Sequence, residues 1–170
     1  TIDAVSRSGL SKQDSFRFLL VLFFGLCAPI VAARFFLIKT HRVSNWDISK
    51  RAQRIKPLIV LVAYLSLFFL ILVYFQNAFL IRYYALLYFW IIGFFILNLF
   101  QKISGHIGIL TLSLLLIIHW NGFVWWPVFI TIPLLAWSRV ALKRHTMGEV
   151  IGGVVYPIMV FFLARELHLI

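Results

Sequence analysis

The sequence has little charge, few acidic residues and a single cysteine, Cys27. Charged residues make up 12% of its 170 residues, whereas an ordinary soluble domain contains about 25%. One cysteine excludes a scaffold held together by disulfides. Hydrophobic residues make up 63%, which excludes a disordered chain and exceeds what a soluble domain of this length can bury. The composition therefore indicates an integral membrane protein.

Six charge-poor segments are candidates for membrane-spanning helices. Their hydrophobic runs are continuous and do not alternate, which favours helices over the strands of a barrel. The segments are Phe16–Ile38, Pro57–Leu80, Tyr83–Phe100, Ile107–Trp120, Phe123–Trp137 and Val150–Leu163. Each span needs about 20 residues, so six of them leave room only for short loops. The last three segments are shorter than this, so flanking polar residues extend their helices or the spans begin in a recess of the membrane surface.

These segments predict one all-α domain over residues 1–170, a six-helix transmembrane bundle with a short N-terminal tail at residues 1–15. Six spans place both termini on one side of the membrane, face Y, and the loops after the first, third and fifth spans on the other, face X. Of the 16 Lys and Arg residues, eleven fall on face X, against five acidic residues in the whole chain.

Two explanations account for this excess of positive charge. Basic loops stay on the cytoplasmic side during membrane insertion. A cluster of cations also binds an anion, such as a phosphate or an anionic lipid head group. Nucleic acid is not an expected partner, because loops this short offer little surface to a duplex.

Three polar clusters lie on face X: Asp47–Pro57, Lys102–His106 and Ser138–Glu149. Two spans separate the first cluster from the second, and two more separate the second from the third. An even number of spans returns the chain to the same surface of the membrane. We therefore expect the three clusters to meet there.

The second and third clusters carry the sequences Ser-Gly-His and Ser-Arg-x5-His-x3-Glu, which together resemble the type-2 phosphatidic acid phosphatase family. That family is related to bacterial nonspecific acid phosphatases and to vanadium haloperoxidases. The resemblance runs from about Asp47 to Gly153, and the order of the motifs, two spans apart, makes it specific. It implies a six-helix membrane enzyme with its active site at one membrane surface.

Two positions and the first motif depart from the family's pattern. Glu149 stands where the family usually has Asp, and Ile103 stands where it often has Pro. The family's first motif is usually Lys-x6-Arg-Pro. Here the corresponding stretch reads Asp-x3-Arg-x2-Arg-x2-Pro, with Arg51 and Arg54 as the cations.

The resemblance implies a role for each motif residue. His145 would attack phosphorus and form a phosphohistidine, with Glu149 holding its other ring nitrogen. If the stretch is helical, their spacing of four places them on one face. His106 would protonate the leaving alkoxide and then activate water. The implied phosphate-binding residues are Arg139, Ser104, Gly105, Arg51, Arg54, Lys50 and Ser138.

The implied activity is the metal-independent, cofactor-free hydrolysis of a lipid phosphate or lipid diphosphate, with the bacterial inner membrane as the expected location. Phosphatidic acid, phosphatidylglycerol phosphate, a polyprenyl diphosphate and a lipid A phosphate all fit. The sequence leaves open which of these is the substrate, which membrane face carries the site, and the oligomeric state.

Two other functions are compatible with the same residues. In a metallo-hydrolase, His106, His145 and Glu149 would be metal ligands, although the Arg-rich setting repels a cation. In a non-catalytic protein of the same fold, the clusters would bind or transport a lipid phosphate without hydrolysing it.

Overall fold

The computed structural model describes residues 9, 11–23, 31, 35, 39, 51–74 and 77–170, and the regular secondary structure of these residues is entirely helical. This confirms the all-α class. The helices, in chain order, are α2 (Lys12–Leu22), α4 (Arg51–Tyr74), α5 (Ala78–Phe100), α6 (Gly105–Asn121), the 3-10 helix η2 (Phe123–Ile130), α7 (Thr131–Ala141) and α8 (Met147–Glu166).

Within the described residues, four helical segments are long and apolar enough to cross a membrane. They are Pro57–Tyr74, Ala78–Phe100, Phe123–Ala141 and Met147–Glu166. α6 is apolar but shorter, with 17 residues. Of the first predicted span, α2 covers only the beginning, and most of the remainder lies outside the described residues. Four such helices indicate a multi-pass membrane protein.

The boundary between the second and third predicted spans is wrong. α4 ends at Tyr74, and Leu80, which was predicted to close the second span, lies in α5. Asn77 begins α5 by capping it: its side-chain Oδ1 accepts the backbone N–H of Leu80 at 3.0 Å. Asn is a favoured N-cap residue because its side chain satisfies an amide that has no partner within the helix.

Other helices also begin or end at residues that differ from the predicted bounds of the spans. α2 begins four residues before Phe16, because the Ser11 side chain accepts the backbone N–H of Asp14 at 3.1 Å. α8 extends beyond both ends of the predicted Val150–Leu163, which confirms that flanking polar residues lengthen this span. The fifth segment is not one regular helix, since η2 precedes α7 and contains Pro127.

The chain divides into two compact units, one formed by residues 1–88 with 169–170 and the other by residues 89–168. In the first unit, aromatic side chains join α4 to the beginning of α5. Phe69 stacks on Tyr88 with 5.8 Å between ring centroids, and the Tyr88 hydroxyl lies 2.6 Å from Ser66 Oγ. This hydrogen bond satisfies two polar groups between otherwise apolar helices.

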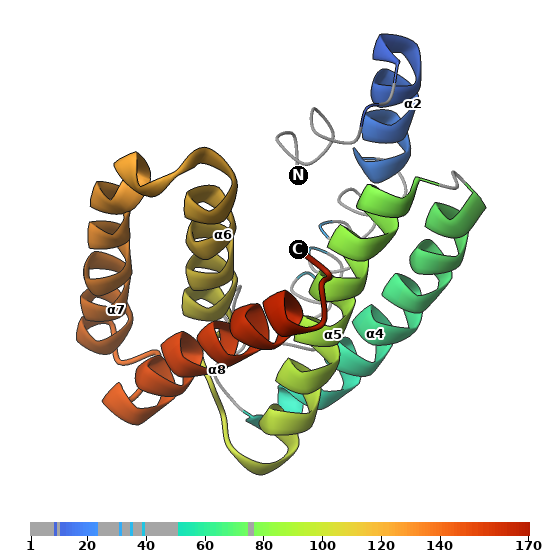
Figure 1. The fold of residues 1–170 in the computed structure, drawn as a ribbon. Helices are drawn as coiled ribbons and strands as arrows, with labels where there is room; N and C mark the ends of the chain where they lie inside the picture. The colour runs from blue at the N-terminus through green and yellow to red at the C-terminus, as the bar shows by residue number, and fades with distance from the viewer. Residues whose placement is uncertain are drawn as a thin grey trace. The chain divides into compact units, whose positions relative to one another are not determined.

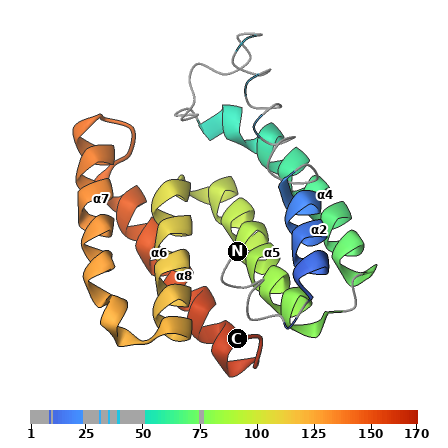
Figure 2. The same ribbon diagram turned by 90° about the horizontal axis from the view of Figure 1, so that it is seen from above.

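In the second unit, α6 and α7 run side by side in opposite directions, joined by η2, and α8 crosses them (Figures 1 and 2). Glycines allow α6 and α8 to approach closely. A Cβ atom on Gly153 would lie 2.8 Å from the Ser104 carbonyl oxygen, and one on Gly152 would lie 2.9 Å from Ile103 Cγ2. Gly152 and Gly153 therefore permit close packing of α8 against the start of α6.

We expect Gly153→Ala to destabilise the packing of α6 against α8. The added methyl group would meet a backbone oxygen that cannot rotate away, and such overpacking costs about 1–3 kcal/mol. Thermal unfolding of the purified protein in detergent should therefore show a lower Tm. Gly148→Ala is the matched control, because a Cβ on that glycine of the same helix meets nothing within 4 Å. Equal Tm values for the two variants would contradict the packing argument.

Candidate active site

The third cluster, Ser138–Glu149, contains a tight turn between α7 and α8. The Arg139 carbonyl accepts two backbone N–H groups, from Arg144 at 3.0 Å and from His145 at 3.2 Å. Lys143 adopts a positive φ of 53° within this turn. The chain therefore turns between the end of α7 and the first residue of α8, and His145 lies just before α8.

Thr146 and Glu149 form a capping box at the start of α8. The backbone N–H of Glu149 donates to Thr146 Oγ1 at 3.3 Å, and the backbone N–H of Thr146 donates to Glu149 Oε2 at 3.4 Å. The sequence Thr-x-x-Glu is typical of this motif, in which a Glu at the third helical position folds back to the cap. The Glu149 carboxylate is therefore directed back along the chain toward His145.

His145 and Glu149 are in direct contact. His145 Nδ1 lies 2.7 Å from Glu149 Oε2, with the His145 side chain 0% exposed and that of Glu149 16% exposed. The two side chains are in contact, as the resemblance implies, but they do not share a helical face, because His145 precedes α8. With Nδ1 directed at a carboxylate, the ring proton is held there and the lone pair is on Nε2, which is also buried.

Lys102 is part of the same arrangement, although the sequence did not single it out as a site residue. Its Nζ lies 3.0 Å from Glu149 Oε2 and donates to the Arg144 carbonyl oxygen at 2.8 Å. Lys102 lies in the segment between α5 and α6, separated from Ser-Gly-His by Ile103 alone. Its expected position on face X, beside a motif, was the signal that could have identified it.

The beginning of α6 is attached to the beginning of α8 through Ser104. The backbone N–H of Ser104 donates to the Glu149 carbonyl oxygen at 3.0 Å. Ser104 Oγ is fully buried and has no hydrogen-bond partner within the described part of the chain. Gly105 follows as the first residue of α6, and a Cβ there would lie 3.0 Å from the ring of Phe94. The expected meeting of the second and third clusters is therefore confirmed.

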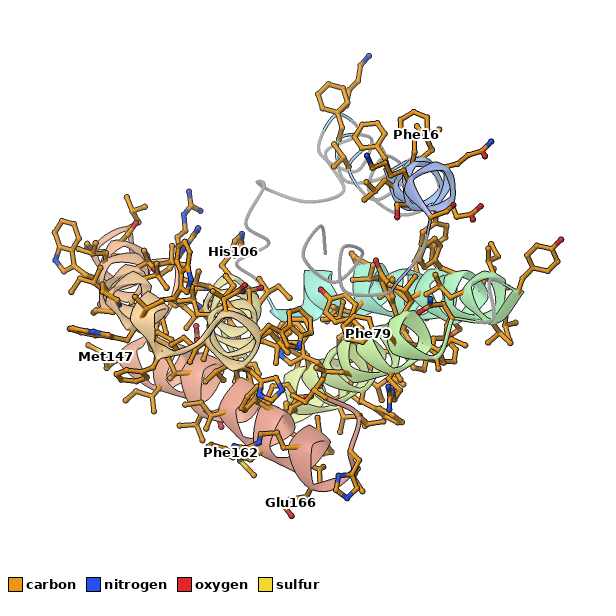
Figure 3. All side chains as sticks on the ribbon, turned by 45° about the horizontal axis from the view of Figure 1, so that its top comes forward. Phe16, Phe79, His106, Met147, Phe162 and Glu166 are labelled. Atoms are coloured by element: carbon orange, nitrogen blue, oxygen red, sulfur yellow. The ribbon has the colours of Figure 1, made fainter. Side chains whose placement is uncertain are left out.

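Three other predicted residues lie around this arrangement. His106 is exposed in the first turn of α6, and Figure 3 shows its side chain projecting away from α8. Ser138 and Arg139 lie in the last turn of α7 and are half-buried, with Arg139 Nε itself buried. Their predicted roles as general acid and phosphate-binding groups remain predictions.

The first cluster belongs to the other unit of the chain. Arg51 and Arg54 lie in the first turns of α4, but their side chains are outside the described residues, as is the whole of Lys50. Their predicted contribution to phosphate binding therefore also remains a prediction.

Within the described ranges, no three His, Cys, Asp or Glu side chains are grouped so that they could hold a metal ion. The Glu149 carboxylate instead forms an ion pair with the Lys102 ammonium. An ammonium group at that oxygen competes electrostatically with a metal cation for the same position. The arrangement is therefore suited to positioning a histidine ring and holding its proton.

Comparison with models of protein families finds no match for this chain, and comparisons with curated proteins and with solved structures find none either.

We expect His145 to carry its ring proton on Nδ1 when the ring is uncharged, because Glu149 Oε2 accepts a hydrogen bond at that nitrogen. Glu149→Ala should move part of the population to the Nε2–H tautomer. The ¹⁵N chemical shifts of histidine-labelled protein measure this, with the His145 signals assigned by their loss in His145→Asn. The same tautomer in wild type and Glu149→Ala would show that Glu149 does not determine it.

Proposed function

We propose that this chain is a membrane-bound phosphatase of the type-2 phosphatidic acid phosphatase family, which hydrolyses a lipid phosphate or lipid diphosphate through a phosphohistidine at His145. The observation that supports this most directly is the 2.7 Å contact between His145 Nδ1 and Glu149 Oε2. A carboxylate on one ring nitrogen leaves the lone pair on the other and stabilises the positive charge that develops during attack.

In the first step, His145 Nε2 attacks phosphorus and the bond from phosphorus to the leaving oxygen breaks. That oxygen departs with the lipid alcohol of a lipid phosphate, or with the lipid monophosphate of a lipid diphosphate. His106 donates a proton to the leaving oxygen. In the second step, His106 takes a proton from water, the water oxygen attacks phosphorus, and the phosphorus–nitrogen bond breaks to release inorganic phosphate. Because Nε2 is buried, the side chains around it must move when a phosphate group enters.

Positive charge and helix-terminal amides stabilise the phosphate in both steps. Arg139 offers two parallel N–H donors to phosphate oxygens, which spreads the charge of the transition state. The backbone N–H groups at the start of α6, from Gly105 onward, favour an anion at that position. Ser104 and Ser138 are the other proposed phosphate-binding residues of this unit. Arg51, Arg54 and Lys50 are proposed to bind phosphate on the family resemblance alone.

The proposed setting is a bundle of six transmembrane helices with the site on face X. A site between apolar helices at a membrane surface suits a phosphate carried on a hydrocarbon tail, which reaches it from within the bilayer. This argument favours an amphiphilic substrate over a small soluble ester. The bacterial inner membrane is the proposed location.

The proposed activity is tested by measuring inorganic phosphate released from four lipids in detergent: phosphatidic acid, phosphatidylglycerol phosphate, a polyprenyl diphosphate and a lipid A phosphate. We expect release from at least one of them. His145→Ala should lower kcat by about 10³-fold or more, because the nucleophile is lost. His106→Ala should lower it by about 10²–10⁴-fold, the range for a general acid.

Lys143→Ala is the control, since this cation is exposed in the same turn and has no proposed role. It should retain wild-type turnover. Normal turnover in His145→Ala would refute the assigned nucleophile. Binding of the lipids without any phosphate release would instead support the non-catalytic alternative.

Phosphate release should be unaffected by excess EDTA. In the proposed mechanism, Arg139 and helix-terminal amides stabilise the phosphate charge. Removal of divalent cations therefore removes no group that the reaction uses. The same assay, repeated after dialysis against chelator and after addition of Mg²⁺ or Zn²⁺, measures this. Activity that is lost with chelator and restored by a metal would favour a metallo-hydrolase.

A further inference from the structure

Glu149 Oε2 is approached by three donors from two segments of the chain. They are His145 Nδ1 at 2.7 Å, Lys102 Nζ at 3.0 Å and the backbone N–H of Thr146 at 3.4 Å. His145 and Thr146 are local neighbours of Glu149, whereas Lys102 comes from the segment between α5 and α6. Lys102 Nζ also donates to the Arg144 carbonyl oxygen at 2.8 Å, so it is held at two points.

We propose that Lys102 is a positioning residue, which sets the orientation and the protonation of His145 by acting on the Glu149 carboxylate. This inference rests on the proposed function of His145 as nucleophile. Lys102 acts through Glu149, and the lipid phosphate is bound by other groups.

The orientation effect follows from the geometry of the contacts. A Glu side chain has three rotatable bonds, and without Lys102 only two local neighbours, the His145 ring and the more distant Thr146 amide, would hold Oε2. The Lys102 ammonium holds Oε2 from another segment of the chain, and its bond to the Arg144 carbonyl fixes the ammonium relative to the residue before His145. Misplacement of a reacting group by about 1 Å can cost about 10²-fold in rate.

The protonation effect follows from the charges around the ring. Glu149 stabilises the protonated imidazolium of His145, which cannot attack phosphorus. Lys102 offsets part of that negative charge at a distance of 3.0 Å. Arg139, in the last turn of α7, and Arg144, directly before His145, are further cations in this part of the chain. Removal of the Lys102 charge should therefore let His145 remain protonated to a higher pH.

The test compares Lys102→Met and Lys102→Arg with Lys143→Met, which removes an exposed cation from the adjacent turn. For Lys102→Met we expect kcat on the lipid phosphate to fall about 10- to 100-fold while KM changes by less than about two-fold. The acidic limb of its pH–rate profile should move to higher pH. Lys102→Arg should recover much of the activity, and Lys143→Met should match wild type.

A second measurement does not depend on turnover. The ¹⁵N titration of His145 in histidine-labelled protein should have a higher midpoint in Lys102→Met than in wild type or Lys143→Met. If wild type releases no phosphate but this midpoint moves, the proposed function fails and the control of His145 by Lys102 stands.

Three results would overturn the inference. A rise in KM with unchanged kcat would make Lys102 a substrate-binding group. An unchanged titration midpoint would remove its effect on His145. Equal loss of kcat and Tm in both Lys102 variants, with no shift of the pH profile, would make Lys102 a purely structural link.

Discussion

One carboxylate, that of Glu149, connects the parts of the candidate site. Its Oε2 contacts His145, Lys102 and the Thr146 amide, while its backbone carbonyl accepts the Ser104 amide. The turn after α7, the start of α8 and the segment before α6 are therefore held by a single residue. A mostly buried carboxylate requires such donors, because an uncompensated buried charge is expensive. His145, Lys102 and the Thr146 amide supply these donors.

The capping box explains why a glutamate can stand where the resembled family usually has an aspartate. At the third position of α8, a Glu side chain folds back far enough to reach the Thr146 amide and the ring of His145. This folded-back conformation of the side chain accommodates the extra methylene group of Glu relative to Asp. A glutamate at this position can therefore contact the histidine. The two residues do not share a helical face, because His145 precedes α8.

The polar contacts depend on apolar packing beside them. Ser104 can donate to the Glu149 carbonyl only because α6 and α8 approach closely, and Gly152 and Gly153 make room for Ile103 and the Ser104 carbonyl. In a membrane, where lipid tails are as apolar as the side chains, small residues are a common means of bringing helices together. Substitution at these glycines would thus affect the polar contacts through the spacing of the two helices.

The sequence by itself determined the all-α class and most of the long apolar helices, because composition and continuous hydrophobic runs are local properties of the chain. The contact of His145 with Glu149 was expected from the family resemblance, but the capping box of α8 forms it, and not a shared helical face. The sequence misplaced the start of α5, since Gln76 and the capping Asn77 are uncharged and interrupt an otherwise apolar run only briefly. It also missed Lys102 as a member of the site. A lysine in a basic loop has many possible partners, and which carboxylate it meets depends on how closely α6 and α8 pack. That contact was decided only by the tertiary structure, because it joins segments that are distant in the sequence through a glycine-lined helix crossing.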